Sequence, residues 1–248
     1  MQLFLIGIGT GNPDYLTQQA AHAIKMADLI LIPYKGIEKS DLADLRLGIV
    51  HAIRPEAPIE FFDMPDRATD VPYLAAVNDW HGQIAERWAH AMAKHPHAHH
   101  VALLVWGDPS LYDSTLRIAA RLTPQPDMKV IPGITAMQAL TAAHAIPLNT
   151  INDPVLLTTG RQLQKRGWPD GATRVVVMLD GACAFQHLDQ KGMFIWWGAY
   201  LGMADEILDA GPLAQVGARI IARRAAARTR KGWIMDTYLL ARDEGRVP

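Results

Sequence analysis

The chain has 248 residues, of which 50% are hydrophobic and 20% are charged, the composition of a globular protein with room for one large domain or two smaller ones. Its formal net charge of −1 excludes the basic surface that nucleic-acid-binding proteins carry, and its single cysteine, Cys183, excludes an intramolecular disulfide. No apolar run approaches the roughly 18 residues of a membrane-spanning helix, and the first residues lack the basic segment of a signal peptide. We therefore expect a cytoplasmic protein that binds neither nucleic acid nor a membrane.

The first half of the chain alternates between short apolar runs and longer amphipathic segments. The apolar runs predict strands at 2–8, 29–32, 59–62, 101–106 and 128–131. Between them, the spacing of apolar residues predicts helices that begin near Thr17 and Asp41, cover 71–94, run from Ser110 or Ser114 to Leu122, and run from Thr135 to Leu140. This alternation predicts a parallel α/β sheet with right-handed connections.

The pattern becomes less regular after about Ala145. Strands are predicted at 155–158, 174–178, 193–197 and 233–240, and helices at 204–210 and 213–228. This mixture is typical of an α+β sheet rather than a parallel one. We therefore expect two domains, 1–145 and 146–248, with a parallel sheet in the first and a mixed sheet in the second.

The strand predicted at 101–106 ends in Gly107, Asp108 and Pro109. These residues force a turn, because proline fixes its own φ and disfavours a helical conformation in the residue before it. In parallel α/β sheets, ligands bind at the carboxyl ends of the strands, so Gly107 and Asp108 are candidates for a ligand site. The turn at 132–135 follows the next predicted strand, and its backbone N–H groups either bind an anion or simply begin a helix.

The glycine-rich loop at 7–13, GIGTGNP, has some features of a dinucleotide-binding loop. Its third glycine is misplaced for close packing of a following helix, and Pro13 removes an N–H that a phosphate would bind. The next predicted strand also ends at Pro33, Tyr34 and Lys35, without an acidic residue to bind a ribose diol. A nicotinamide or flavin cofactor is therefore disfavoured, although the glycines still allow the backbone to approach a ligand closely.

Two further clusters have both a functional and a purely structural interpretation. The four histidines between 95 and 100 lack the acidic or cysteine partners of a metal site, so we predict a solvated loop and no metal. Trp196 and Trp197 either line an apolar ligand site or pack in the core.

The basic residues form two local groups. Arg161, Lys165 and Arg166 lie just past the strand predicted at 155–158, where a ligand edge is expected. The second group, at 223–231, is more typical of a solvated helix face.

Four landmarks of the chain occur in an order that resembles the tetrapyrrole (precorrin) methyltransferases. That family opens with G-x-G-x-G-x-P-x-x-L-T, here Gly7 to Thr17, and continues with G-D-P at Gly107 to Pro109, P-G-I at Pro132 to Ile134 and I-P-L at Ile146 to Leu148. Within the family, the likeness is greatest to members that methylate precorrin-5 at ring carbon C-1 and release its acetyl group as acetate. The segments that carry this closer likeness are 35–46, 106–118, 154–161, 175–185, 196–208 and 231–240.

This resemblance implies a two-domain tetrapyrrole methyltransferase fold with the ligand cleft between the domains, usually in a homodimer. It implies S-adenosylmethionine as the methyl donor, S-adenosylhomocysteine as its product, and a place in cobalamin (vitamin B12) biosynthesis. The positions that match cofactor-contacting sites of the family are Pro13, Gly107, Asp108, Leu111, Thr135, Ala136, Met178, Ala199, Tyr200 and Leu201.

The two implied steps, methyl transfer and release of acetate, need different groups from the protein. Methyl transfer needs mainly proximity and orientation, because the cofactor carries its own leaving group. Release of acetate also needs a base that activates water and a donor that stabilises an oxyanion, and Asp108, Tyr112 and Arg161 are candidates by their position at strand ends. The substrate carries many carboxylates, for which the candidate partners are Lys35, Arg161, Lys165 and Arg166.

Three alternatives remain open at this point. Another member of the family, such as a different precorrin methyltransferase or a diphthine synthase, would keep the cofactor and change the acceptor. A nicotinamide-dependent oxidoreductase would need the glycine pattern that fails above. A non-catalytic nucleotide-binding protein would keep the ligand site and turn nothing over.

Overall fold

A computed structural model gives the structure of the chain over residues 1–34 and 41–242. Its contacts divide the molecule into two compact units, Met1–Ile134 and Thr135–Pro248. The domain limits expected from the sequence, 1–145 and 146–248, stay a prediction, although by these contacts the helix at 136–143 belongs with the second unit. Within the described part of the chain, no helix is long and apolar enough to cross a membrane.

The first unit contains a five-stranded parallel sheet with the strand order β3-β2-β4-β1-β5. Its elements are β1 (Gln2–Gly7), the 3-10 helix η1 (Pro13–Tyr15), α1 (Gln18–Met26), β2 (Leu29–Tyr34), α2 (Asp41–Ile53), β3 (Ile59–Asp63), α3 (Tyr73–Ala93), β4 (His100–Val105), α4 (Thr115–Ala119) and β5 (Asp127–Ile131). The predicted parallel sheet is therefore confirmed. Helix α4 is shorter than predicted, and Ser114 precedes it without a side-chain cap.

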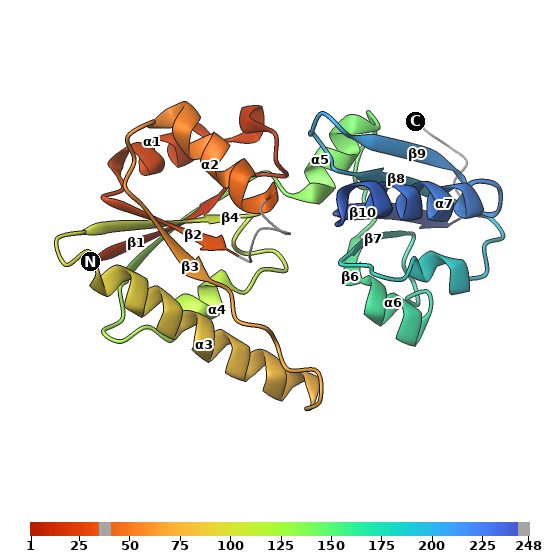
Figure 1. Ribbon diagram of the computed structural model, residues 1–248. Helices are drawn as coiled ribbons and strands as arrows, with labels where there is room; N and C mark the ends of the chain where they lie inside the picture. The colour runs from red at the N-terminus through yellow and green to blue at the C-terminus, as the bar shows by residue number, and fades with distance from the viewer. Residues whose placement is uncertain (35–40, 243–248) are drawn as a thin grey trace. The chain divides into compact units, whose positions relative to one another are not determined.

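Both faces of the first sheet are covered by helices, α1 and α2 on one face and α3 and α4 on the other (Figure 1). Successive residues of β1 alternate between the two cores, with Phe4 and Ile6 packed under the first pair of helices and Leu3 and Leu5 under the second. The neighbouring strands β1 and β4 are thus followed by helices on opposite faces. Ligands of parallel α/β proteins bind beside such a switch point.

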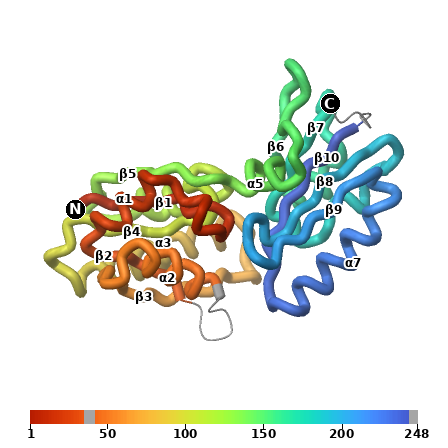
Figure 2. The backbone as a smooth tube through the Cα atoms, turned by 90° about the horizontal axis from the view of Figure 1, so that it is seen from above, coloured from red at the N-terminus to blue at the C-terminus, as the bar shows by residue number. Residues whose placement is uncertain are grey.

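The second unit contains a mixed five-stranded sheet with the strand order β6-β7-β10-β8-β9 (Figure 2). Its elements are α5 (Ala136–Ala143), β6 (Val155–Thr159), α6 (Gly160–Arg166), β7 (Arg174–Met178), the 3-10 helix η3 (Ala184–His187), β8 (Met193–Ala199), β9 (Ile207–Pro212), α7 (Leu213–Lys231) and β10 (Asp236–Arg242). The predicted mixed sheet is confirmed. The helix predicted at 204–210 is wrong, because residues 207–210 pair with β8 as part of strand β9. This strand ends at Gly211 and Pro212, two residue types that disfavour a helix.

Helix α7 packs on the second sheet through residues that recur every three or four positions. The buried members of this stripe are Leu213, Val216, Gly217, Ile220, Arg224 and Ala227. The expectation that 223–231 forms a solvated face holds for the exposed Arg223, Arg228 and Arg230. It is wrong for Arg224, because this residue falls on the buried stripe and is only 8% exposed.

Candidate functional site

Three loops meet at the carboxyl edge of the first sheet, which we call the first edge. They follow β1, β4 and β5, and each contributes a glycine: Gly7, Gly107 and Gly133. A Cβ on Gly133 would lie 2.1 Å from the carbonyl oxygen of Gly107, and one on Gly7 would lie 2.5 Å from the backbone nitrogen of Gly133. Gly107 and Gly9 also exchange backbone hydrogen bonds of 2.8 and 3.3 Å. The backbones approach so closely that only glycine fits at Gly7 and Gly133.

The side chain of Asp108 ties two of these loops together. Its Oδ2 accepts a hydrogen bond of 2.9 Å from the N–H of Gly133, and its Oδ1 accepts one of 2.8 Å from the N–H of Ser110 and another from the Ser110 hydroxyl. Burial raises the pKa of Asp108, but the bonds from Ser110 and Gly133 outweigh this effect and hold the pKa below its usual value. Such a carboxylate is a poor base, so the geometry favours a positioning role for Asp108 over direct proton transfer.

The turn at 132–135 offers fewer free N–H groups than its sequence suggests. The glycine N–H is bonded to Asp108, and the N–H of Thr135 donates to Oε1 of Gln138 at 2.9 Å. These two N–H groups already have acceptors within the protein, which favours the interpretation of this turn as the start of a helix. Thr135 is buried and Ala136 is half-buried, and their contacts with a cofactor stay a prediction from the resemblance.

Pro13, Leu111 and Tyr112 lie in the loops of the first edge. Pro13 is exposed at the start of η1, where the Asn12 side chain accepts a bond of 2.9 Å from the N–H of Asp14, and Leu111 is half-buried. Tyr112 is 42% exposed and has a left-handed backbone with φ 49°. Burial raises the pKa of its phenol, so at neutral pH the hydroxyl stays protonated and is suited to donating a hydrogen bond rather than to acting as a base.

The remaining predicted residues gather at one edge of the second sheet, which we call the second edge. β6 and β7 are parallel, and β10 lies antiparallel between β7 and β8, so β6, β7 and β8 all end at this edge. Thr159 pairs with Met178 across β6 and β7, and the last residue of β8 pairs with Asp236, where β10 begins. The structure therefore brings Arg161, Met178 and 199–201 to the same edge.

The side chains at 199–201 point into the core, where they are between 0% and 4% exposed. The Tyr200 hydroxyl donates a bond of 2.7 Å to the backbone carbonyl of Trp233. A ligand at the second edge can therefore meet 199–201 chiefly through backbone atoms. Trp196 and Trp197 are also buried. Trp197 belongs to the hydrophobic core of the second unit, which confirms the core interpretation for this residue, whereas Trp196 packs against Phe194 and Arg174.

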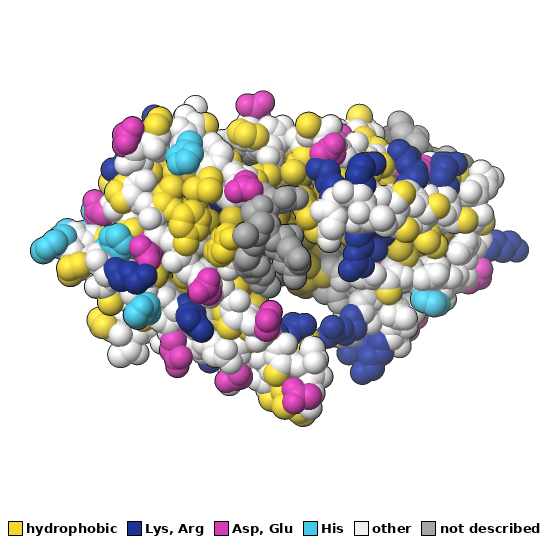
Figure 3. Space-filling view, in the orientation of Figure 1, with side chains coloured by type: hydrophobic (Ala, Val, Ile, Leu, Met, Phe, Trp, Pro, Cys, Tyr) yellow, Lys and Arg dark blue, Asp and Glu magenta, His cyan; other side chains and the backbone are white. Residues whose placement is uncertain are grey.

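The basic residues expected to bind carboxylates lie on α6, which begins where β6 ends. Arg161, Lys165 and Arg166 are all exposed, with Arg161 next to the second edge and the other two in the last turn of the helix. On the face drawn in Figure 3, Lys and Arg side chains gather over the second unit. Lys35 lies outside the residues that the structure describes.

Two of the clustered histidines have carboxylate partners. Nε2 of His95 lies 3.1 Å from Oε2 of Glu60, and Nδ1 of His100 lies 3.2 Å from Oδ2 of Asp28. Over residues 1–34 and 41–242, no three His, Cys, Asp or Glu side chains are arranged to hold a metal ion.

Sequence reasoning missed three charged residues whose side chains are buried behind the second edge: Asp180, Arg224 and Asp236. The burial of Arg224 could have been predicted, because its spacing places it on the apolar stripe of α7 between Ile220 and Ala227. The burial of the two aspartates could not have been predicted, since polar residues are common where strands begin and end.

Comparison with known proteins assigns these features to one family. The sequence matches the profile of the Tetrapyrrole (Corrin/Porphyrin) Methylases over residues 2–217. A precorrin-6A synthase [deacetylating] from Sinorhizobium sp. is 45% identical over an alignment that covers 96% of this chain and 94% of that protein.

Solved structures agree with this assignment. The crystal structure of a putative cobalamin synthesis related protein, CobF, from Corynebacterium diphtheriae matches with a TM-score of 0.85 and 40% identity, covering 98% of this chain and 100% of that one. Uroporphyrin-III C-methyltransferase from Thermus thermophilus, complexed with S-adenosylhomocysteine, has the same fold, with a TM-score of 0.60 and 18% identity over 97% of both chains. With the profile match spanning most of the sequence and the four landmarks lying on the loops of the two units, the chain belongs to the tetrapyrrole methylase family.

Proposed function

We propose that the chain is an S-adenosylmethionine-dependent C-methyltransferase of cobalamin biosynthesis that acts on precorrin-5, methylating C-1 and releasing acetate to give precorrin-6A. The observation that carries this proposal is the 45% identity to a precorrin-6A synthase over 96% of the chain. A likeness of that length includes the substrate-binding candidates of the second unit as well as the cofactor motifs of the first.

The charge of the first edge fits a sulfonium cofactor better than a dinucleotide. Its loops, 7–17, 107–114 and 132–135, contain three aspartates and no lysine or arginine. Aspartates in these loops favour a sulfonium cation, and the loops themselves supply no basic side chain to a pyrophosphate. The glycines of these loops also leave the backbone open to close approach by a ligand.

When bound, S-adenosylmethionine supplies the methyl group together with its own leaving group. The protein then has to hold the cofactor and the ring carbon in line and keep water from the methyl group. In our proposal, the backbone of the first edge orients the cofactor, and Asp108 keeps the loops of that edge in place.

Release of acetate needs a water molecule whose oxygen attacks the acetyl carbonyl. The bond between the acetyl carbon and the ring then breaks, acetate leaves with that oxygen, and the electron pair stays on the macrocycle. Because the Tyr112 phenol remains protonated at neutral pH, we assign it as a donor to the developing oxyanion rather than as the base. Arg161 is assigned to a substrate carboxylate, which its planar fork can bind through two hydrogen bonds.

The proposal extends to the finer points implied by the resemblance. The protein acts as a homodimer in the cytoplasm. The cofactor contacts it includes are Pro13, Gly107, Asp108, Leu111, Thr135, Ala136, Met178, Ala199, Tyr200 and Leu201, and the substrate contacts are Lys35, Arg161, Lys165 and Arg166.

Product analysis tests this function directly. The protein is incubated with precorrin-5 and S-adenosylmethionine that carries a deuterated methyl group, and the tetrapyrrole and the released acetate are measured by mass spectrometry. We expect a product that has gained one labelled methyl group and lost one acetyl group, with one acetate formed for each methyl transferred. Methyl gain without acetate would assign the chain to a different methyltransferase step, and the absence of label transfer would contradict the proposal.

A further inference from the structure

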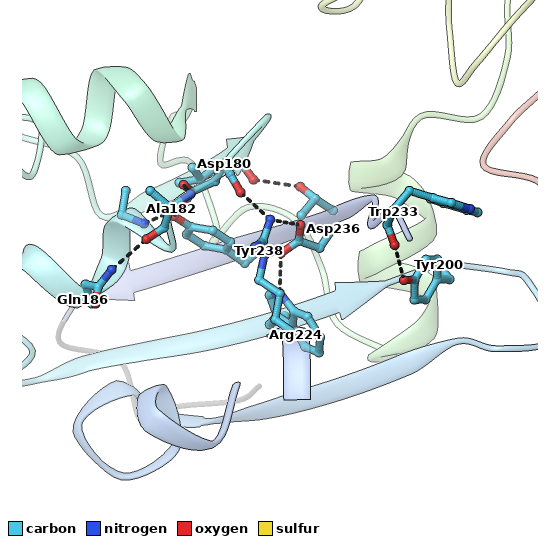
Figure 4. A network of polar contacts seen from close by, with 12 residues as sticks. Asp180, Ala182, Gln186, Tyr200, Arg224, Trp233, Asp236 and Tyr238 are labelled. Carbon is cyan, nitrogen blue, oxygen red and sulfur yellow. Dashed lines mark hydrogen bonds and ion pairs between the residues drawn. The ribbon is translucent and has the colours of Figure 1, made fainter. Parts of the chain in front are cut away.

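A buried carboxylate organises the loop that follows β7 (Figure 4). Asp180 is 5% exposed. Its Oδ1 accepts a bond of 3.0 Å from the N–H of Ala182, and its Oδ2 accepts bonds of 2.6 Å from the N–H of Ala184 and 2.6 Å from the hydroxyl of Tyr238. One side chain therefore fixes the backbone of 179–184 from inside the protein.

Arg224 on α7 connects this loop with β10 and β8. Its guanidinium donates bonds of 2.9 and 3.1 Å to the two carboxylate oxygens of Asp236, and its Nη2 also donates a bond of 2.9 Å to the backbone carbonyl of Asp180. Asp236 accepts a further bond of 2.9 Å from Nε1 of Trp197 on β8. A single buried ion pair thus contacts the loop after β7 and the strand that leads into 199–201.

The backbone above this ion pair is held in an unfavourable conformation. Leu179 has φ 52°, and Tyr200 at the end of β8 also has φ 52°, a region that costs a residue other than glycine about 1–3 kcal/mol. Leu179 is also 65% exposed, so its own packing does not explain its conformation. Strain that a buried network imposes on an exposed segment is typical of a ligand site.

Stability alone does not explain a buried arginine here. Replacing a buried ion pair with apolar residues of similar volume is often neutral or stabilising, but an apolar pair would not bond the carbonyl of Asp180 and the indole of Trp197 together. The start of α6, where β6 ends, packs against the same carboxylate, because a Cβ on Gly160 would lie 2.3 Å from the carboxyl carbon of Asp180. The network therefore contacts the exits of all three strands that end at the second edge.

We propose that Arg224 and Asp236 are positioning residues that hold the loop after β7 and the end of β8 in the arrangement that binds the adenosyl cofactor. They act through Asp180 and Trp197 on the exposed backbone around Leu179, and neither touches the ligand. This inference rests on the proposed function, because the ligand it names is S-adenosylmethionine and its product S-adenosylhomocysteine.

A double variant with a matched control tests the inference. Arg224→Met with Asp236→Asn removes the ion pair without leaving a buried charge alone. The control is Arg219→Met with Asp209→Asn, since Arg219 on the same helix binds both carboxylate oxygens of the buried Asp209 on β9, at 2.8 and 2.6 Å. For each protein, the affinity for S-adenosylhomocysteine is measured by calorimetry, and hydrogen exchange is measured at the N–H groups that bond Asp180.

The double variant should bind S-adenosylhomocysteine at least tenfold more weakly, and exchange at Ala182 and Ala184 should be at least tenfold faster. The control should change each quantity less than threefold. Arg224→Lys keeps a charge pair but lacks the fork that reaches Asp180, so it should also weaken binding at least threefold, even if the double variant fails to fold.

Affinities within threefold of wild type in both Arg224 variants would overturn the inference, whatever the exchange rates. Failure of the wild-type protein itself to bind S-adenosylhomocysteine would instead contradict the proposed function. In that case hydrogen exchange alone tests whether Arg224 and Asp236 hold the loop after β7. Faster exchange in the double variant would support this role, and unchanged exchange would overturn it.

Discussion

The loops of the first edge and the loops of the second edge are stabilised by different kinds of interaction. At the first edge, backbone lies directly against backbone at Gly7 and Gly133, and one partly exposed carboxylate, Asp108, joins two loops. At the second edge, the loops rest on buried side chains that include the ion pair of Arg224 and Asp236. Close backbone approach needs glycine at fixed positions and so leaves a short motif, whereas a buried network draws on residues far apart in the chain and leaves none.

The largest effect is expected from a single methyl group at the first edge. Gly133→Ala would place its Cβ 2.1 Å from a backbone oxygen that no flexible side chain can move aside. We expect a loss of about 3 kcal/mol or more in the free energy of unfolding. Urea unfolding measures it, with Gly48→Ala as the control.

Gly48 is exposed in α2 and has no atom within 4 Å of its would-be Cβ. The control should therefore be neutral or gain up to about 1 kcal/mol from better helix propensity. Equal stability of the two variants would show that the first edge is not held by close backbone contact.

A second comparison separates charged from neutral hydrogen bonds at the second edge. Tyr238→Phe removes a bond to the carboxylate of Asp180, and Tyr200→Phe removes one to the backbone carbonyl of Trp233. We expect losses in unfolding free energy of about 1.5–3 kcal/mol for the first variant and about 0.5–1.5 kcal/mol for the second. Denaturant unfolding of both variants shows which of them loses more unfolding free energy. A larger loss for Tyr200→Phe would contradict the expectation that the bond to the charged carboxylate of Asp180 is the stronger one.

The stability that the Asp108 carboxylate gives to the first edge should depend on pH. The pKa of Asp108 lies below its ordinary value of 3.8 in the folded protein, so its stabilising effect is complete above about pH 5 and is lost as the pH falls through 3.8 toward the folded value. At neutral pH, Asp108→Asn should cost about 1 kcal/mol, since the group is partly exposed.

Unfolding of wild type and Asp108→Asn between pH 7 and about pH 3 tests this linkage. The difference between the two proteins should stay constant near neutrality and narrow below about pH 4. A difference that grows on acidification would mean that the Asp108 carboxyl is bound in its protonated form.

An effect of similar size is expected on the binding of the substrate. Arg161→Lys keeps the charge but loses the planar fork, and we expect the KM for the tetrapyrrole to rise about three- to tenfold, equivalent to about 0.7–1.4 kcal/mol, with the KM for S-adenosylmethionine unchanged. Arg228→Lys, at an exposed position of α7, is the control and should change neither constant. A rise confined to the cofactor constant would move Arg161 to the cofactor site.

The sequence predicted the first sheet and the glycine turns at its carboxyl edge because both depend on local patterns. Continuous apolar runs specify strands buried on two faces, and glycines mark the turns that follow them. The hydrogen-bond partner of Asp108 could not be predicted from the sequence, because Gly133, whose N–H donates to its Oδ2, lies 25 positions away. That bond gives Asp108 a role in holding a loop, in addition to the cofactor contact that stays a prediction.

The second unit was harder to predict because its structure is decided by partners distant in sequence. Strand β9 gains its conformation by pairing with β8, which overrides the local preference of 204–210. Arg224 was placed on a solvated face with its basic neighbours, although its register on the apolar stripe indicated burial. The exposure of the side chains at 199–201 could not be inferred from the resemblance, which gives positions and not orientations.

Calorimetric titration with S-adenosylhomocysteine and with NAD tests the central claim most directly, because the proposed function and the assignment of both edges depend on the class of cofactor. The proposed function predicts binding of S-adenosylhomocysteine at low micromolar affinity or tighter, about −8 kcal/mol, and no measurable heat with NAD. Tight binding of NAD without binding of S-adenosylhomocysteine would contradict it.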